Sequence, residues 1–517
     1  MRKVETNLER KTLSEQPKLL VSWIDTNYVK QQRWFLHKSA RIKDLRLRDS
    51  WILKKSKKID IICMILDIEY FDLQQKDTYY LPLILDFEHE SMDRAIAKIC
   101  GHDFVAILYD CSNSIEYYRV LMNYIWSHAK LKSINGYVEF IPIGRCTPYP
   151  IKEVSEFTGE QSNTVMFVGK KDIVKTFRRM QPGINPDLEI HLNLCSIADS
   201  PIPKLNGYIS YNGMDGTEYT LAMIERYVPN DGDAWQYVLK HLDRFFDYAR
   251  ANHYQRNVVE LVHSYSMPFQ KEVVRLGQVI AELHYELAQV FGYDDIDKDD
   301  LSEWQHRFLD NVERAFTHSS KLPNWLLDSK NQIMRQAQKL FDIKDTGMKI
   351  RIHGDLHLGQ ILKTRDSFCV IDFEGEPLKP YEEVRKKSSP LRDVAGMLRS
   401  FNYAVTLMIK NKRTQITADK TTQITADKGA RMTADYLYEW GRCWEELICN
   451  KFVEEYLRYT KHKGGDYLPE DELSLKLMLT LFKLEKAMYE LEYEINCRPN
   501  WIDIPLQGIK QCLHNLV

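Results

Sequence analysis

Hydrophobic residues in the first 110 positions fall into short runs that are rich in β-branched and aromatic side chains. Polar residues separate these runs, which occupy residues 59–68, 79–86 and 103–109. Short apolar runs with polar breaks between them are typical of strands. The pattern therefore predicts an antiparallel sheet in this part of the chain.

A second pair of short apolar runs, at 164–168 and 172–177, flanks a glycine-containing turn and predicts a hairpin. The pattern changes after residue 234, where apolar residues recur at helical spacing. One helical face, for example, carries Leu276, Ile280, Leu283 and Leu287. We therefore expect an α+β chain in which the strands precede most of the helices.

The length of 517 residues is enough for about three structural units of ~150 residues each. The changes of pattern fall near residues 124 and 230, which gives segments at 1–124, 125–230 and 231–517. Near the C-terminal third, the letters T-Q-I-T-A-D-K occur at 414–420 and again at 422–428. Two copies are too few for a solenoid, so we interpret them as a duplicated, solvated insertion between two helices.

The composition is that of an ordinary globular protein. The chain has 71 basic and 73 acidic residues, so a net charge of −2 gives no reason to expect nucleic acid or an anionic membrane as a partner. Its apolar runs are shorter than the ~18 residues that suggest a membrane span, and the charged N-terminus does not resemble a secretory signal. Ten cysteines without a C-x-x-C pair fit free thiols. We expect a cytoplasmic protein.

Three polar residues between apolar segments indicate the chemistry of the chain. Gln360 lies five residues after Asp355, and Asp372 follows the next short apolar runs. In kinases of the protein-kinase-like fold, the first Asp orients the acceptor hydroxyl, while the amide and the second Asp hold a metal that bridges the ATP phosphates. The histidines His353 and His357 lie at i and i+4, but neighbouring glycines predict a loop and not a helical zinc site.

Two sequence motifs in this region resemble those of bacterial maltokinases. They are H-G-D-L-H-L-G-Q at 353–360 and I-D-F-E-G-E-P at 371–377. These enzymes belong to the aminoglycoside-phosphotransferase-like group. The resemblance implies a bilobal protein-kinase-like fold of the α+β class. Its N-terminal β-rich cap subdomain would be 1–124, its N-lobe 125–230, and its mostly helical C-lobe 231–517.

The same resemblance implies that the chain uses ATP and Mg²⁺. Asp355 is then the catalytic base, and Gln360 and Asp372 are metal ligands. Glu374 adds either a contact to a second metal or a water-mediated contact.

Lys175 lies in the second strand of the expected hairpin. In this fold, a Lys at that position holds the α- and β-phosphates and pairs with a Glu on the next helix. The segment from Lys175 to Glu189 resembles maltokinases, which implies that these two residues form the ion pair. Asp187 is nearer in sequence and stays open as the partner. The loop before the hairpin lacks the kinase glycine pattern, so we expect the hydroxyls of Ser162 and Thr164 to contact phosphate.

The C-terminal segment resembles the ending of maltokinases, E-K-A-x-Y-E-x-x-Y-E and R-P-x-W-x-x-I-P. The resemblance implies a sugar site that contains Lys486, Tyr489, Glu490, Tyr493 and Arg498. Aromatic faces pack on the C–H surface of a sugar, and charged groups bond its hydroxyls. The alternative is an amphipathic closing helix whose Tyr and Met residues lie in the core.

Taken together, the motifs predict a maltokinase that transfers the ATP γ-phosphoryl group to the anomeric hydroxyl of maltose, giving maltose 1-phosphate for α-glucan and glycogen synthesis. Two alternatives stay open. One is a kinase for glucosamine or another sugar, because related enzymes share the sequence motif at 353–360. The other is a non-catalytic module that partners trehalose synthase. Retention of Lys175, Asp355 and Asp372 argues against that module.

Overall fold

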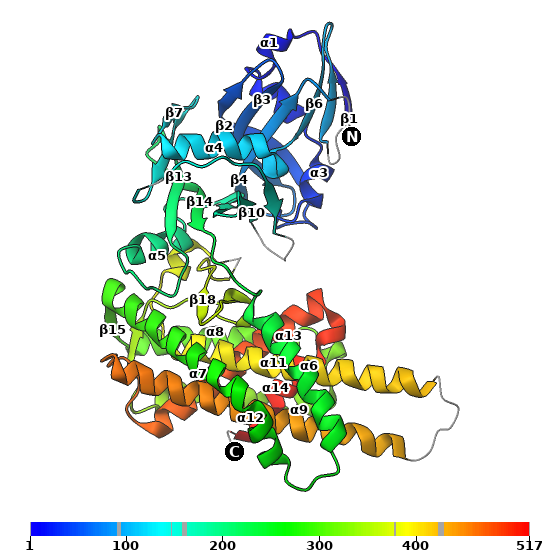
Figure 1. Cartoon of the computed structure of the whole chain (residues 1–517), viewed down its shortest axis with the longest axis vertical. Coiled ribbons are helices and arrows are strands. Elements are labelled where there is room, and N and C mark those ends of the chain that lie inside the picture. Colours follow the sequence, from blue (N-terminus) through cyan, green and yellow to red (C-terminus); the bar gives the residue numbers. More distant parts are fainter. Residues whose placement is uncertain are drawn as a thin grey trace. The chain divides into compact units, whose positions relative to one another are not determined.

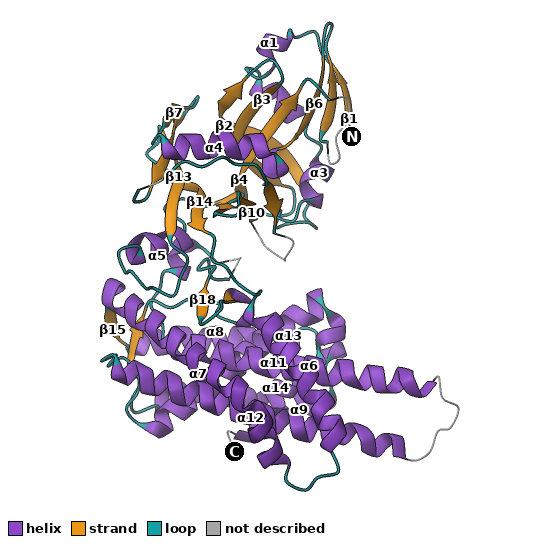
Figure 2. Cartoon of the chain, viewed as in Figure 1, coloured by secondary structure: helices purple, strands orange, loops and turns teal. Residues whose placement is uncertain are grey.

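The computed structural model describes residues 2–89, 95–145, 147–157, 163–376, 379–421 and 429–515. The chain folds into two compact units (Figure 1). Unit 1 comprises Met1–Cys195, Pro203–Tyr227 and Pro377–Tyr381, and unit 2 comprises Ser196–Ile202, Val228–Glu376 and Glu382–Val517. Strands dominate unit 1 and helices dominate unit 2 (Figure 2), as the hydrophobic pattern predicted.

The first sheet of unit 1 has the order β1-β5-β6-β4-β3-β2, with β12 beside β4. Its strands are β1 (Arg2–Glu5), β2 (Ile42–Lys55), β3 (Ile59–Tyr70), β4 (Lys76–Asp86), β5 (Ala97–Cys100), β6 (Val105–Asp110) and β12 (Arg179–Met180). Neighbouring strands are antiparallel, apart from the parallel pair β1 and β5. This confirms the antiparallel sheet that the apolar runs predicted.

Helices cover both faces of this sheet. Ile62 and Met64 of β3 share a hydrophobic core with the short helices α1 (Arg10–Leu13), α2 (Pro17–Ser22) and α3 (Thr26–Gln31). Ile61 and Cys63 face the opposite side, where the core includes α4 (Ile115–Trp126). Burial on both faces explains why β3 is an almost continuous apolar run without polar alternation.

The second sheet of unit 1 has the order β7-β8-β13-β14-β11-β10-β9. Its strands are β7 (Lys130–Lys132), β8 (Gly136–Pro142), β9 (Val154–Glu156), β10 (Thr164–Val168), β11 (Asp172–Thr176), β13 (Leu205–Gly213) and β14 (Glu218–Arg226). The hairpin expected around residue 170 is therefore β10–β11. Residues of α4 pack in one core with both sheets, so the segment boundary predicted near residue 124 falls inside this helix.

Unit 2 is mostly helical. Its longer helices are α6 (Ala234–Asn252), α7 (Val258–Phe291), α8 (Lys298–Phe316), α9 (Asn324–Gln338), α11 (Leu391–Thr421), α12 (Gly429–His462), α13 (Glu472–Cys497) and α14 (Asp503–Asn515). The two short hairpins are β15 (Tyr293–Asp295) with β16 (Met348–Ile350), and β17 (Ile361–Lys363) with β18 (Phe368–Val370). Short helical turns complete the elements: η1 (Cys111–Asn113), α5 (Pro186–Leu194), η2 (Ser319–Lys321), η3 (Lys339–Asp342), η4 (Leu358–Gln360), α10 (Tyr381–Val384) and η5 (Pro499–Trp501).

The expected helical face of α7 is confirmed, because all four of its leucine and isoleucine positions are buried. The first copy of the seven-residue repeat differs from the expectation. It continues α11, which extends beyond the other helices beside α12 (Figure 1), and the repeat contains no residue that breaks a helix. The second copy, at 422–428, lies outside the described residues.

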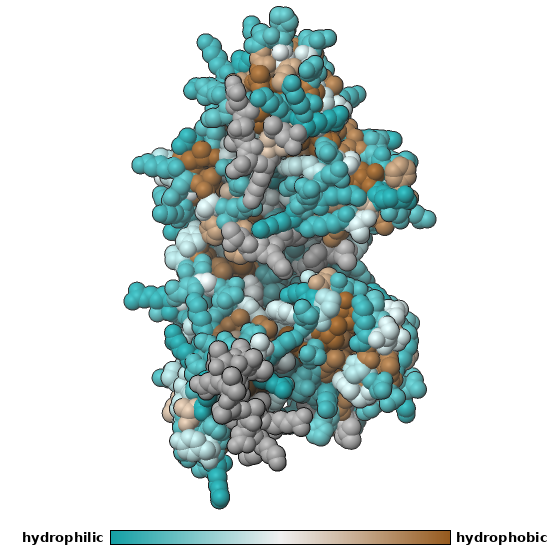
Figure 3. Space-filling model, turned by 90° about the vertical axis from the view of Figure 1, so that its right-hand side faces the viewer, coloured by the Kyte–Doolittle hydropathy of each residue, from teal (hydrophilic) through white to brown (hydrophobic). Residues whose placement is uncertain are grey.

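Hydrophilic residues cover most of the molecular face in Figure 3, and hydrophobic residues appear there in separate groups. Among the described helices, none combines the length and the apolar composition that crossing a bilayer requires.

Candidate active site

The predicted catalytic loop joins β16 to β17 in unit 2, and Asp393 at the start of α11 holds it in place. The backbone N–H groups of His353 and Gly354 donate to the Asp393 carboxylate, with N···O distances of 2.7 and 3.0 Å. His284 Nε2 lies 3.1 Å from the same group. Burial alone would raise the pKa of Asp393, but the hydrogen bonds from His284 and from the loop lower it. Asp393 therefore anchors the loop from α11.

His353 links this loop to the end of β18. Its Nδ1 accepts from the Asp355 N–H at 3.3 Å, and its Nε2 lies 3.0 Å from the carbonyl oxygen of Ile371. This arrangement fits the tautomer with hydrogen on Nε2. His353 therefore acts as a structural tie between two loops and not as a zinc ligand.

Asp355 forms an ion pair that the sequence did not predict. Lys486 Nζ, on α13, lies 2.9 Å from Asp355 Oδ1. Partial burial alone would raise the pKa of Asp355, but the positive charge of Lys486, with a smaller effect of His357, lowers it to about 2. Asp355 is therefore ionised at neutral pH and accepts hydrogen bonds.

The two expected metal ligands lie together at the end of the β17–β18 hairpin. Gln360 Nε2 donates to Asp372 Oδ2 at 2.9 Å. Asp372 has a φ of 70°, a left-handed conformation that is uncommon for residues other than Gly, Asn and Asp. Side-chain oxygens of Asp372 and Glu374 lie within 4.8 Å of each other. Two carboxylates and an amide oxygen are donors that Mg²⁺ prefers, so these residues fit the ion.

The predicted sugar-binding residues lie along α13, apart from Arg498, which directly follows the helix. Lys486 contacts Asp355, and its ammonium lies 5.0 Å from the centre of the Tyr489 ring. Glu490 instead pairs with the buried Arg399, whose Nε donates to Glu490 Oε2 at 3.0 Å. The guanidinium of Arg399 takes up part of the hydrogen-bonding capacity of Glu490, and the role of Glu490 in sugar binding stays a prediction.

Tyr493 lies near the end of α13, and Arg498 caps the helix. The Arg498 guanidinium is 5.2 Å from the Tyr493 ring and 5.1 Å from the Trp501 ring. Tyr493 is 41% exposed. Arg498 Nε also lies 3.6 Å from Glu494 Oε2. The role of Tyr493 and Arg498 in sugar binding stays a prediction.

Unit 1 places Lys175 of β11 against the carboxylate that the sequence left as an alternative. Lys175 Nζ lies 2.7 Å from Asp187 Oδ2, and both side chains are buried. The charge of Lys175 is one reason that the pKa of Asp187 is lowered although its burial acts in the opposite direction. Glu189 lies half-buried on the same helix, α5, and its predicted pairing with Lys175 stays a prediction.

The structure describes one of the two residues that were expected to contact phosphate, Ser162 and Thr164. Ser162 lies outside the described residues. Thr164 is buried, and its Oγ1 accepts a hydrogen bond from Arg178 Nε at 2.9 Å. Arg178 also donates to Asp110 at 2.8 Å. Thr164 thus belongs to a buried network within unit 1, and its contact with phosphate stays a prediction.

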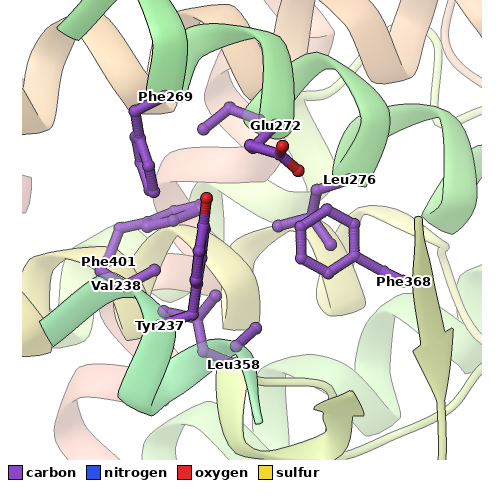
Figure 4. Close-up of a pocket in the computed structure, with 10 residues that line it drawn as sticks. Tyr237, Val238, Phe269, Glu272, Leu276, Leu358, Phe368 and Phe401 are labelled. Carbon is purple, nitrogen blue, oxygen red and sulfur yellow. The ribbon is translucent and has the colours of Figure 1, made fainter. Parts of the chain in front are cut away.

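A small cavity lies behind the β17–β18 hairpin (Figure 4). It measures about 10 Å³, and its lining includes Leu358, Phe368, Phe401 and Glu272. Lys363 Nζ lies 3.3 Å from Glu272 Oε2. A cavity of this size holds at most one water molecule. It is therefore a packing feature behind the catalytic loop and not a sugar site.

Several contacts of the predicted site residues were missed, because contacts between residues far apart in the sequence leave no local pattern. Lys486 lies 131 positions from Asp355, and Arg399 lies 91 positions from Glu490. One missed residue did have a signal. His191 follows Asp187 by four positions, which places both side chains on one face of a helix.

No family model matches this chain. It is 27% identical to the glucosamine kinase of Mycolicibacterium smegmatis over 256 residues, which are 49% of this chain and 59% of that protein. It is 21% identical to the glucosamine kinase of Streptacidiphilus jiangxiensis over 355 residues, which are 67% of this chain and 70% of that protein. The first alignment thus spans less than two thirds of the relative.

A solved structure of a glucosamine kinase in complex with glucosamine, ADP and inorganic phosphate is similar over 98% of this chain and 99% of that one. The TM-score is 0.62 and the sequence identity is 17%. A second crystal form of glucosamine kinase gives a TM-score of 0.61, with 17% identity over 96% of this chain and 99% of that one. The chain has the fold of these kinases. The predicted α+β, bilobal kinase-like fold is confirmed.

Proposed function

We propose that the chain is an ATP-dependent sugar kinase, which transfers the γ-phosphoryl group of ATP to a sugar hydroxyl. One observation carries the proposal: a single loop and hairpin in unit 2 bring Asp355 to Lys486 and Gln360 to Asp372. Two relatives named glucosamine kinase support it, although they are distant in sequence.

In this proposal Asp355 orients the acceptor hydroxyl by accepting its hydrogen bond. A pKa near 2 makes Asp355 a weak base, so it takes the proton only once the new P–O bond is largely formed. A loose phosphoryl-transfer transition state tolerates such a late proton transfer. The ammonium of Lys486 lies beside the same carboxylate, and in this proposal it would contact the acceptor as well.

Asp372, Gln360 and Glu374 would hold Mg²⁺, which supplies positive charge to the ATP phosphates when it is bound. Lys175 would steady the α- and β-phosphates, and Asp187 would orient its ammonium. Both assignments rest on the match of these residues to the motifs of the kinase fold.

We favour glucosamine as the first acceptor, because the relatives are named for it. Lys486 disfavours an ammonium group close to Asp355, so the amino group of glucosamine would have to bind away from this carboxylate. Maltose is the second candidate, favoured by the stacked Lys486 and Tyr489 within the motif that resembles maltokinases. A maltose 1-phosphate product, a role in glycogen synthesis and a trehalose synthase partner belong to this second candidate alone.

The test is ATP consumption with glucosamine, maltose, glucose and trehalose, measured for the wild type and for Asp355→Asn. The amide keeps the shape of the side chain and removes its charge, so we expect turnover of the preferred sugar to fall about 10²–10⁴-fold. Asp366→Asn, in the exposed turn of the β17–β18 hairpin, is the matched control and should keep wild-type turnover. Equal activity of Asp355→Asn and wild type on every sugar would contradict the proposal.

A further inference from the structure

A buried histidine in unit 1 connects two carboxylates on opposite sides of its ring. His191 Nδ1 lies 2.8 Å from the carbonyl oxygen of Asp187 and 3.3 Å from Asp187 Oδ1, and Nε2 lies 2.9 Å from Glu225 Oε1. The other Asp187 oxygen, Oδ2, is the one that lies 2.7 Å from Lys175 Nζ. The four side chains thus form a continuous series, Glu225–His191–Asp187–Lys175.

The fold explains why these side chains meet. Glu225 lies opposite Ile173 in the β11–β14 ladder, and Lys175 is two residues beyond Ile173. Side chains two residues apart point to the same face of a sheet, so Glu225 and Lys175 share a face. Asp187 and His191 are four residues apart on α5 and project from one side of that helix.

The four side chains of this series carry charge and are almost completely shielded from solvent. The side chains of Lys175 and Glu225 are each 9% exposed, that of Asp187 is 1% exposed, and His191 is fully buried. Burial alone would lower the pKa of His191, but the carboxylates of Glu225 and Asp187 raise it to about 10. With His191 protonated, two cations balance two anions.

The three residues Asp187, His191 and Glu225 are close enough together to be considered as a metal site. The geometry favours a proton instead. Each ring nitrogen faces a different carboxylate, so an ion bound to one nitrogen would be separated from the far carboxylate by the ring. Asp187 is also already paired with the ammonium of Lys175.

We propose that His191 and Glu225 are positioning residues, which fix the Asp187 carboxylate and thereby aim Lys175. The proposal deepens the assignment of Lys175 to the nucleotide phosphates and rests on that proposed function. The carboxylate of Glu225 keeps His191 protonated. The protonated ring then neutralises part of the negative charge on the Asp187 carboxylate, which Lys175 also contacts. Lys175 is therefore oriented by Asp187 but keeps positive charge for a phosphate.

The first test measures the charge of His191 directly. Its imidazole is followed by NMR from about pH 6 to about pH 11 in the wild type and in Glu225→Gln. The groups that face the ring are Asp187 and Glu225, with Lys175 beyond Asp187. We expect the wild-type ring to stay charged well above the usual pKa of ~6.5, and the Glu225→Gln ring to lose its proton at least about two pH units lower. Wild-type titration near 6.5 would overturn the proposal, whether or not the protein binds nucleotide.

The second test measures the affinity for ADP with excess Mg²⁺ by calorimetry at about pH 6 and about pH 9. In Glu225→Gln we expect affinity near that of the wild type at the lower pH, and a loss of about ten-fold at the higher pH, where His191 becomes neutral. His191→Gln should be weaker at both pH values. Glu218→Gln, on the same strand as Glu225, is the control and should match the wild type.

His191→Gln leaves Glu225 buried without its partner, so this variant is at risk of misfolding. The double variant His191→Gln/Glu225→Gln removes both charges together and should fold while showing the same pH-independent loss. ADP affinities within about two-fold of the wild type in all these variants would overturn the positioning role. A wild type that binds no ADP, yet keeps His191 charged, would instead contradict the assignment of Lys175 to nucleotide.

Discussion

At the scale of single residues, the ion pair between Lys486 and Asp355 changes the expected chemistry most. The sequence assigns Asp355 to the reaction and Lys486 to the sugar, as two separate roles. The structure places the two charged atoms 2.9 Å apart, so the cation tunes the carboxylate directly. In the proposed reaction, a pKa of about 2 would make Asp355 an orienting group first and a base only late in the transfer.

This ion pair predicts that the pH dependence of kcat in Lys486→Met differs from that of the wild type. The cation lowers the pKa of Asp355, while partial burial acts to raise it. Without the cation the pKa should rise to the usual ~3.9 or above, and the acid limb of kcat should move up by about two pH units. Activity is then lost as pH falls through the new, higher pKa, because Asp355 becomes protonated.

The measurement is kcat against pH from about pH 2.5 to about pH 8 at saturating ATP, with the sugar that gives the highest turnover. Lys476→Met, whose exposed lysine pairs with Glu472 on the same helix, is the control and should leave the profile unchanged. An acid limb that coincides in Lys486→Met and the wild type would show that Asp355 does not set it.

At the scale of elements, the first turns of α11 hold the catalytic loop from one side. Asp393 accepts the N–H groups of His353 and Gly354, and Ser400 Oγ accepts the N–H of Leu358 at 3.1 Å. Between these two contacts lies Gly396. Positions 393, 396 and 400 share one helical face, so a single stripe of α11 fixes the loop that carries the proposed base.

The close approach of Gly396 predicts that Gly396→Ala displaces the loop. An added Cβ would lie 2.5 Å from the carbonyl oxygen of Leu356, the residue after Asp355. Such a contact with backbone should cost about 1–3 kcal/mol of stability and lower kcat, although Gly→Ala within a helix usually stabilises by about 1 kcal/mol. Thermal unfolding and kcat are measured together.

Gly441→Ala on α12 is the matched control for this substitution. Its Cβ would meet side-chain atoms and no backbone: Ile409 Cδ1 at 2.9 Å, Val405 Cγ1 at 3.0 Å and Phe246 Cζ at 3.3 Å, which are able to shift. We expect near-wild-type kcat from this variant. A Gly396→Ala enzyme with unchanged kcat and a higher Tm would refute a role for this close packing in holding the loop.

The sequence predicted the elements better than the contacts between them. Periodicity located β3, β10–β11 and the buried face of α7, because apolar spacing is a local property. Local motifs likewise brought Gln360 to Asp372 across one hairpin. Three-dimensional packing decided the rest: Lys175 meets Asp187, Glu490 meets Arg399, and Lys486 meets Asp355. None of these pairings follows from spacing alone.

At the scale of the whole molecule, each unit has its own hydrophobic cores. Those of unit 1 join the two sheets to α1–α4, and a core of unit 2 joins α8 and α9 to α13 and α14. Lys175 belongs to unit 1, and Asp372 belongs to unit 2. Stability measured on the full chain is therefore the direct way to detect a ligand without assuming its acceptor.

Nucleotide binding should raise the melting temperature of the full chain only when a divalent metal is present. A ligand at about 100 times its Kd stabilises the folded state by about 2.7 kcal/mol, so we expect ADP with Mg²⁺ to raise Tm by a few degrees and EDTA to abolish the increase. Asp372→Asn removes the charged ligand but keeps a residue type that tolerates the positive φ at this position. This variant should lose the Mg²⁺-dependent increase while its ligand-free Tm stays close to wild type, and Asp366→Asn should behave as wild type. If ADP stabilised Asp372→Asn and the wild type equally, and EDTA had no effect on either, Asp372 would not be the metal ligand and nucleotide binding would depend on protein groups alone.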